Sequence, residues 1–286
     1  MLKFGVDTFI WSESFSEKDL FLIEKAKSLG FDVIETFISN PFTYPTKLVK
    51  DKLKNVDIEV VTATVMSKDT NFLSPDAAVR KKGVQYLKKV IDINNEIGSK
   101  IVGGVNYAGW GYLTGKCRTG DEWKWSVECM RQAAEYAQNT GKLAICIEPV
   151  NRFETHFINI AADAVKYCQD VGFVNMKVHL DSFHMIREEL SFIEAVETCG
   201  KQYLGYVHVC ENNRGIPGTG LVPWEKFFTA LVAAGYDGPL VIESFDPSFK
   251  ELASMCAIWR NFADTGEELA VKGLANLRAI ERKLNL

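Results

Sequence analysis

Four apolar stretches in this chain end on a charged or histidine residue and then pass into a polar segment. They end at Glu148, Asp181, His208 and Glu243. In a protein that alternates parallel strands with helices, the carboxyl ends of successive strands meet on one face. We therefore expect these four side chains to converge on a single site, with the rest of the chain as its scaffold.

Strand and helix signals alternate along the whole chain. Short runs rich in β-branched residues, such as 60–65, predict strands. Ser74 as N-cap, Pro75 as first helical residue and Gly98 at the end predict one long helix. Eight strands are expected, at 4–11, 31–37, 60–65, 101–105 and 143–148 and in the runs that end at Asp181, His208 and Glu243.

With about eight helices between them, among them one at 187–198, these strands predict an α/β fold, a closed (β/α)₈ TIM barrel. An open doubly wound sheet is the alternative, and the lack of a G-x-G-x-x-G segment disfavours it. No linker divides the chain, so one domain is expected over 1–286. Its C-terminal helical extension would start at about 248 and break near 264–266.

Composition excludes several classes of function. The net charge of −4 without a basic stripe argues against nucleic-acid binding. No apolar run approaches the ~18 residues of a membrane span. The seven cysteines are scattered and include no C-x-x-C pair, which predicts free thiols in a reducing cytoplasm.

The predicted convergence of three carboxylates and one imidazole suggests a metal site. An Asp or Glu after a strand is more often a helix cap or a loop residue when taken alone, but four such ends on four consecutive strands favour a joint site. An oxygen-rich donor set suits Mn²⁺, with Co²⁺ or Mg²⁺ as alternatives, and Zn²⁺ is less favoured. No cysteine is expected at this point of the barrel.

Glu148 and Glu243 end different strands and could approach a bound substrate from different sides. A cation beside the carbonyl of an α-hydroxyketone acidifies the neighbouring C–H. One carboxylate could remove that proton and the other return one to the opposite face, which inverts the carbon. The sequence therefore suggests acid–base catalysis by two glutamates.

Other residues are candidates for substrate contacts. Glu154 could bind a hydroxyl group, His184 the carbonyl oxygen, and Arg214 could orient hydroxyls with its planar fork of donors. Aromatic residues are expected to form an apolar wall that excludes water: Trp110, Trp11 and Phe245.

Three further expectations concern residues near these candidates. Asn151 and Arg152 are expected to tie down the loop and brace Glu148. His179 is expected to point into the barrel as a buried polar residue. Glu35 and His156 have no role that the sequence suggests.

Three central motifs resemble those of the D-tagatose 3-epimerase family, which includes the D-psicose (D-allulose) 3-epimerases. They are Glu-Pro-Val-Asn-Arg-Phe-Glu (148–154), Leu-Asp-Ser-Phe-His-Met (180–185) and Gly-Tyr-Val-His-Val-Cys-Glu-Asn-Asn-Arg (205–214). Segments 217–224, 235–243 and 258–260 are also similar to that family.

The resemblance implies a xylose-isomerase-like barrel with a divalent metal, usually Mn²⁺ or Co²⁺. Matched by motif, the metal ligands are Glu148, Asp181, His208 and Glu243. The two glutamates then act as acid and base at C3 of a free ketohexose or ketopentose, through a cis-enediolate. Glu154, His184 and Arg214 hold the sugar. The resemblance also implies a homodimer or homotetramer.

The chain departs from the family in places that we expect to affect the pocket wall and not the metal. Ser244 stands where the family has proline, and Cys210 stands where a smaller or aliphatic residue is common. Substrate identity is therefore open. Another sugar isomerase, an inosose dehydratase, a keto-sugar eliminase and a non-catalytic sugar-binding subunit remain alternatives. A metal-dependent endonuclease is disfavoured, because the chain has four histidines and no basic face.

Overall fold

Eight parallel strands form a closed barrel in the order of the sequence, β1 to β8. A computed structural model describes residues 2–286. The ring closes between the first and last strands, where Val6 lies in register with Ile242, so the (β/α)₈ prediction is confirmed and the open sheet is excluded. The strands are β1 (Lys3–Asp7), β2 (Val33–Phe37), β3 (Glu59–Ala63), β4 (Ile101–Gly103), β5 (Ala144–Ile147), β6 (Met176–Asp181), β7 (Leu204–His208) and β8 (Pro239–Ile242).

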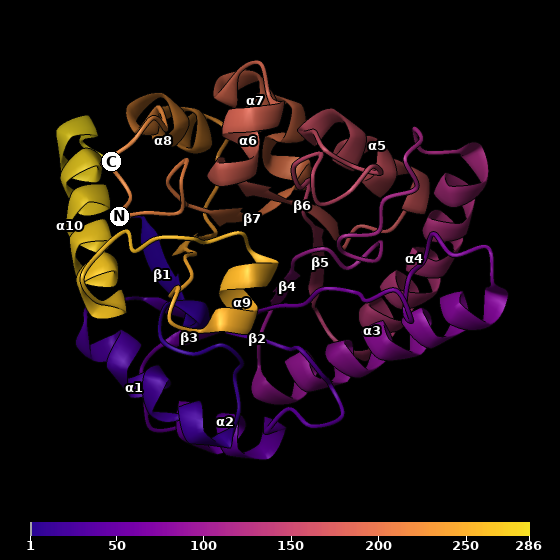
Figure 1. The fold of residues 1–286 in the computed structure, drawn as a ribbon, viewed down its shortest axis with the longest axis horizontal. Coiled ribbons are helices and arrows are strands. Elements are labelled where there is room, and N and C mark those ends of the chain that lie inside the picture. Colours follow the sequence, from indigo (N-terminus) through magenta and orange to yellow (C-terminus); the bar gives the residue numbers. More distant parts are fainter. Residues whose placement is uncertain (1) are drawn as a thin grey trace.

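Helices surround this barrel as an outer layer (Figure 1). They are α1 (Phe21–Ser28), α2 (Thr46–Leu53), α3 (Ala77–Ile97), α4 (Gly120–Thr140), α5 (Ala161–Val171), α6 (Ser182–Glu188), α7 (Phe192–Tyr203), α8 (Trp224–Ala233), α9 (Lys250–Met255) and α10 (Gly266–Leu284), with short 3₁₀ helices at Thr8–Ile10 and Glu17–Asp19. None of the helices formed by residues 2–286 combines the length and apolarity needed to cross a membrane.

Some boundaries differ from the prediction for local reasons. The first strand is shorter than expected, because the chain turns into a 3₁₀ helix after Asp7. Helix α3 begins at Ala77 rather than at Pro75, since Asp76 is the residue whose side chain caps it, accepting a hydrogen bond from Ala78 N at 2.8 Å. Its predicted end is confirmed, with Gly98 in the left-handed conformation at φ 81°.

The single helix expected at 187–198 is absent, because this range covers the end of α6 and the first part of α7. Helix α6 starts directly after β6, because the Asp181 side chain accepts a hydrogen bond from Phe183 N at 2.8 Å and so caps it. The break expected near 264–266 is present between α9 and α10. Helix α10 lies between α8 and α1 (Figure 1), where Glu267 pairs with Lys25 of α1 at 3.0 Å.

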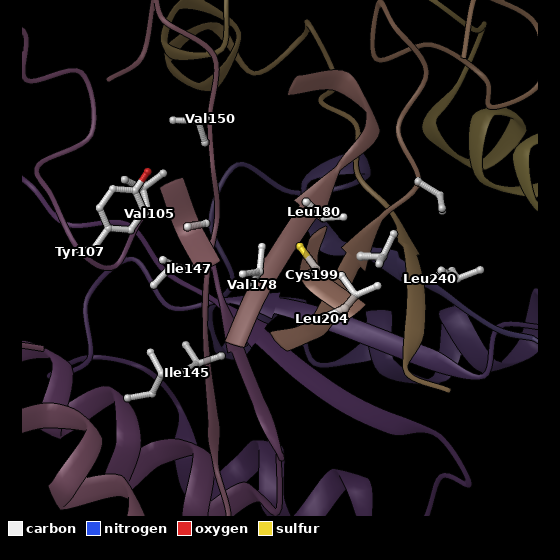
Figure 2. Close-up of a cluster of buried hydrophobic side chains, with 14 of the residues drawn as sticks. Val105, Tyr107, Ile145, Ile147, Val150, Val178, Leu180, Cys199, Leu204 and Leu240 are labelled. Carbon is white, nitrogen blue, oxygen red and sulfur yellow. The ribbon is translucent and has the colours of Figure 1, made fainter. Parts of the chain in front are cut away.

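The alternation of side chains along each strand decides which residues enter the barrel. Ile145 and Ile147 of β5 and Val178 and Leu180 of β6 belong to the large core that includes the buried faces of the helices (Figure 2). The intervening positions form a second layer inside the barrel: Val33, Val61, Cys146, Tyr206 and Val241. Because successive residues of a strand face opposite ways, Glu148, His208 and Glu243 continue the inner rows of β5, β7 and β8.

Candidate metal centre and active site

A cavity of about 340 Å³ opens at the carboxyl ends of the strands. Helix α9 lies in front of the strands in Figure 1 and contributes Leu252 and Met255 to the cavity lining. An apolar wall stands along part of it, formed by Phe9, Phe37, Phe245, Leu252 and Met255. The opposite part of the lining is polar: Glu148, Glu154, His184, Arg214 and Glu243.

Three of the four predicted metal ligands lie together. Asp181, His208 and Glu243 each offer a ligand atom within 4.8 Å of the others. His208 Nδ1 lies 3.7 Å from Glu243 Oε2 and 4.0 Å from Asp181 Oδ2. Both Asp181 Oδ2 and His208 Nδ1 are buried and find no hydrogen-bond partner among residues 2–286. A cation beside the Glu243 carboxylate would give both of these unpartnered buried atoms a partner.

A fourth donor in this cluster was not expected. The Cys210 thiol lies within the same 4.8 Å, and its Sγ is 3.9 Å from Glu243 Oε2. The expectation that no cysteine stands here, and that Cys210 affects only the pocket wall, is therefore wrong. Cys210 follows His208 by two residues in the sequence, and the alternation of side chains along an extended chain could have revealed this.

Glu148 lies beside this cluster and shares members with it. Its carboxylate falls within 4.8 Å of ligand atoms of His179 and His208, and also of Asp181 and His184. Glu148 Oε1 is 3.5 Å from His184 Nε2, and Oε2 is 3.7 Å from His179 Nδ1. We call Glu148, Asp181, His208, Cys210 and Glu243 the polar floor; Glu148 and Glu243 line the cavity, and the other three lie next to them.

Arg214 lies over the polar floor. Its guanidinium pairs with Glu243 through Nη1, and its Nη2 is 3.6 Å from Asp181 Oδ2. The same group lies 4.2 Å from the centre of the Phe183 ring and 4.8 Å from that of Phe245. Two aromatic faces therefore hold the guanidinium against the carboxylates.

Glu154, His184 and Trp110 form a connected group on the polar side. Trp110 Nε1 donates to Glu154 Oε2 at 2.8 Å, and Asn151 Nδ2 donates to Glu154 Oε1 at 2.7 Å. Asn151 N also donates to His184 Nδ1 at 3.1 Å. This accepted bond leaves Nε2 of His184 as the nitrogen that faces Glu148 and Arg214.

Two predicted neighbours do not belong to the site. Arg152 points outward and pairs with Glu188 at 2.9 Å, so it does not brace Glu148. Trp11 does not line the cavity, because its ring lies under the Lys25 ammonium at 5.1 Å. Trp110 and Phe245 do line it. His156 lies apart from the polar floor, with Nε2 3.2 Å from Glu122 Oε1.

Glu35 is the functional neighbour that sequence reasoning missed. Its Oε2 lies 3.0 Å from His208 Nε2 and also accepts a hydrogen bond from the Tyr206 hydroxyl. The Glu35 carboxylate thereby orients the imidazole so that Nδ1 faces Asp181 and Glu243. In the sequence, the only indication of this role was the position of Glu35 near the end of a predicted strand. His179 is fully buried inside the barrel, as expected, and its Nδ1 accepts from Gly104 N at 3.3 Å.

Burial and neighbouring charges shift the pKa values of residues in the polar floor. Desolvation raises the pKa of Glu148 to about 8, although the charge of His208 opposes the shift. Burial alone would lower the pKa of His208, but the Glu35 carboxylate raises it to about 9. Burial and the nearby Asp181 carboxylate raise the pKa of the Cys210 thiol well above its usual range. Burial alone would raise the pKa of Asp181 too, but the charges of Arg214, His184 and His208 lower it below the ordinary value.

The Glu154 carboxyl behaves in the same way. Burial alone would raise its pKa, but the charges of His184 and Arg214 and the hydrogen bonds from Trp110 and Asn151 lower it below the ordinary value. Glu154 is thus an ionised acceptor on the polar side of the cavity.

Comparison with known proteins agrees with the barrel fold. The family model of the xylose isomerase-like TIM barrel matches residues 23–280. A ketose 3-epimerase of Arthrobacter globiformis is 32% identical, over 97% of this chain and 96% of the relative. The chain belongs to the ketose 3-epimerase family of xylose isomerase-like barrels.

Other members of the family are equally similar. A D-psicose 3-epimerase of Agrobacterium fabrum is 33% identical, over 92% of this chain and 91% of its own length. The crystal structure of a D-allulose 3-epimerase from Methylomonas sp. in complex with D-allulose superposes with a TM-score of 0.92. It shares 31% identity, and the match covers 97% of this chain and 96% of that one.

Proposed function

We propose that this protein is a metal-dependent isomerase that epimerises a free ketose at C3. The observation that carries the proposal is a pair of cavity-lining glutamates, the buried Glu148 and the partly buried Glu243, which directly follow strands β5 and β8 and belong to donor groups that share Asp181 and His208. Family membership supports the same reaction. The sugar would be a ketohexose or ketopentose of the D-tagatose, D-psicose or D-fructose type.

The residues present fit a divalent cation. Asp181 Oδ2 and His208 Nδ1 are buried without a hydrogen-bond partner within residues 2–286, and Glu243 completes the group with Glu148 beside it. When bound there, the cation would polarise the substrate carbonyl and make the C3–H more acidic. Of the divalent ions, the carboxylates and imidazole favour Mn²⁺, with Co²⁺ or Mg²⁺ as alternatives.

The two glutamates would carry the proton. One carboxylate takes the C3 proton to give a cis-enediolate, and the other returns a proton to the opposite face of C3. Arg214 pairs with Glu243 and holds that carboxylate in place. Protonation on the face opposite to removal is what inverts the carbon. The glutamate that took the C3 proton then releases it to solvent, and the glutamate that gave a proton regains one from solvent.

The remaining polar residues would orient the sugar. Glu154 is an acceptor for a hydroxyl, and its two donors, Trp110 and Asn151, hold it rigidly. His184 presents Nε2 toward Glu148 and would bind the carbonyl oxygen of the substrate. The apolar wall makes no hydrogen bond to the distal hydroxyls, so it would tolerate several ketoses.

The test is turnover of D-fructose, D-tagatose, D-psicose and L-ribulose by metal-stripped protein in D₂O, with and without Mn²⁺. We expect metal-dependent formation of the C3 epimer with deuterium at C3, and the relative rates will rank the substrates. No epimer from any of these ketoses, with metal demonstrably bound, would overturn the proposal in favour of an isomerase, dehydratase or eliminase.

The proposal includes three finer points. A homodimer or homotetramer is supported by apolar side chains that this chain leaves exposed, among them Phe153 and Leu190, which are 67% and 101% exposed. A cytoplasmic location is supported by the seven scattered cysteines. We also propose that residues 1–286 act as a single domain.

A further inference from the structure

The Cys210 thiol is placed by the backbone to face the same point as His208. Val209 N donates to Val241 O at 2.8 Å, so the chain continues alongside β8 beyond the end of β7. The Ser182 hydroxyl donates to the carbonyl oxygen of Cys210 at 2.6 Å and holds this extension from the other side. Two residues apart on an extended chain, His208 and Cys210 turn their side chains the same way.

The surroundings of the thiol are those of a ligand and not of a core residue. Cys210 is fully buried, yet its Sγ lies 3.9 Å from Glu243 Oε2 and within 4.8 Å of ligand atoms of Asp181 and His208. Two of those neighbours, Asp181 Oδ2 and His208 Nδ1, have no hydrogen-bond partner within residues 2–286. Cys146, by contrast, packs in the apolar inner layer with Val33 and Val241.

We propose that Cys210 is a fourth ligand of the metal centre, together with Asp181, His208 and Glu243. The S–H proton passes to the buffer as the thiolate sulfur becomes a ligand. Thiolate is a soft donor that suits Zn²⁺ and Co²⁺ better than Mn²⁺. Cys210 thus shifts the metal preference of this barrel toward Zn²⁺ and Co²⁺, relative to the same site without a thiol. The inference rests on the metal centre of the proposed function.

The test uses Co²⁺ as a spectroscopic probe of the whole, metal-stripped protein. We expect a sulfur-to-cobalt charge-transfer band in the near ultraviolet for the wild type, and its loss in Cys210→Ser and Cys210→Ala. Cys256→Ala is the matched control, because Cys256 lines the cavity but lies outside the donor cluster. This variant should keep the band.

Metal affinity supplies a second measurement. Loss of a residue that only supports a ligand weakens metal binding by ~10–100-fold, so loss of a direct ligand should weaken Zn²⁺ binding at least ~10-fold. Isothermal titration of Cys210→Ser should show this loss for Zn²⁺ and a much smaller one for Mn²⁺. An equal loss for both ions would contradict the inference.

A wild-type Co²⁺ complex that lacks the charge-transfer band would also overturn the proposal that Cys210 is a ligand, whether or not the variants fold. These readouts do not depend on turnover. Epimerisation without the band would reject the cysteine ligand and leave the proposed function intact, whereas the band without epimerisation would reject only the proposed function.

Discussion

The polar floor and the apolar wall lie side by side but are built from opposite chemistry. The floor gathers carboxylates, an imidazole and a thiol, and it leaves Asp181 Oδ2 and His208 Nδ1 without hydrogen-bond partners among the described residues. The wall consists of packed rings and aliphatic chains, with Phe9 4.8 Å from Phe37 and 5.3 Å from Phe245 between ring centres.

The floor and the wall therefore affect the stability of the fold in opposite directions. Burial of apolar surface stabilises the protein, so the wall contributes to the fold as it shapes the cavity. Burial of charged groups without full pairing costs stability, and such groups persist where function requires them. We therefore expect changes in the floor to act on chemistry and metal binding, and changes in the wall to act on substrate affinity.

Replacement of a floor glutamate should have the largest effect. Glu148→Gln and Glu243→Gln each keep the shape of the side chain but remove its ability to accept the C3 proton. General acid–base groups contribute ~10²–10⁴-fold to the rate of a catalysed reaction, so we expect kcat to fall by at least ~10²-fold. Deuterium exchange at C3 of the ketose measures this fall. Glu188→Gln, at the ion pair with Arg152 outside the cavity, is the control and should change kcat little. A floor variant with near wild-type exchange would refute the assignment.

Loss of the carboxylate behind His208 should come next. Glu35→Gln keeps a polar group beside Nε2 but removes the charge that orients the imidazole. Metal affinity should fall by ~10–100-fold, as for other residues that support a metal-bound histidine. Calorimetric titration with Mn²⁺ measures this, and saturating Mn²⁺ should restore most of the kcat. An unchanged affinity for Mn²⁺ would mean that Glu35 supports the packing of the barrel interior and not the metal site.

Removal of the metal should lower the stability of the fold. A ligand at one hundred times its Kd stabilises the folded state by ~2.7 kcal/mol, which corresponds to a Tm higher by several degrees. Thermal melts with EDTA and with Mn²⁺ should differ by this amount in the wild type. His208→Ala should show little of the shift, and a full shift in that variant would place the ion elsewhere.

A change in the wall should have the smallest effect. Met255 lines the cavity from α9 and is 58% exposed, so Met255→Ala leaves no sealed cavity. We expect KM to rise by a few fold with kcat nearly unchanged, since uniform binding is lost and the proton transfer is not. Steady-state kinetics on D-psicose tests this. A fall in kcat comparable with that of a floor variant would remove the distinction between floor and wall.

Local patterns predicted most of the fold but could mislead at boundaries. Asp181 shows why: the sequence allowed it to be a helix cap or a metal ligand, and in the structure one carboxylate oxygen caps α6 while the other faces His208. Without that cap, residues 182–188 carry no strong helix signal, which explains the late start predicted for this helix.

The sequence by itself determined which residues end strands and which way they face, because side-chain direction alternates along a strand and that period is local. The inward direction of the Glu148, His208 and Glu243 side chains follows from this alternation. The tertiary structure alone decided which side chains meet across the barrel. Glu35 reaches His208 from 173 residues away, and Asp181, His208 and Glu243 meet only because β6, β7 and β8 are neighbours in a closed ring. Contacts of that kind depend on strand order, register and closure, which no local period encodes.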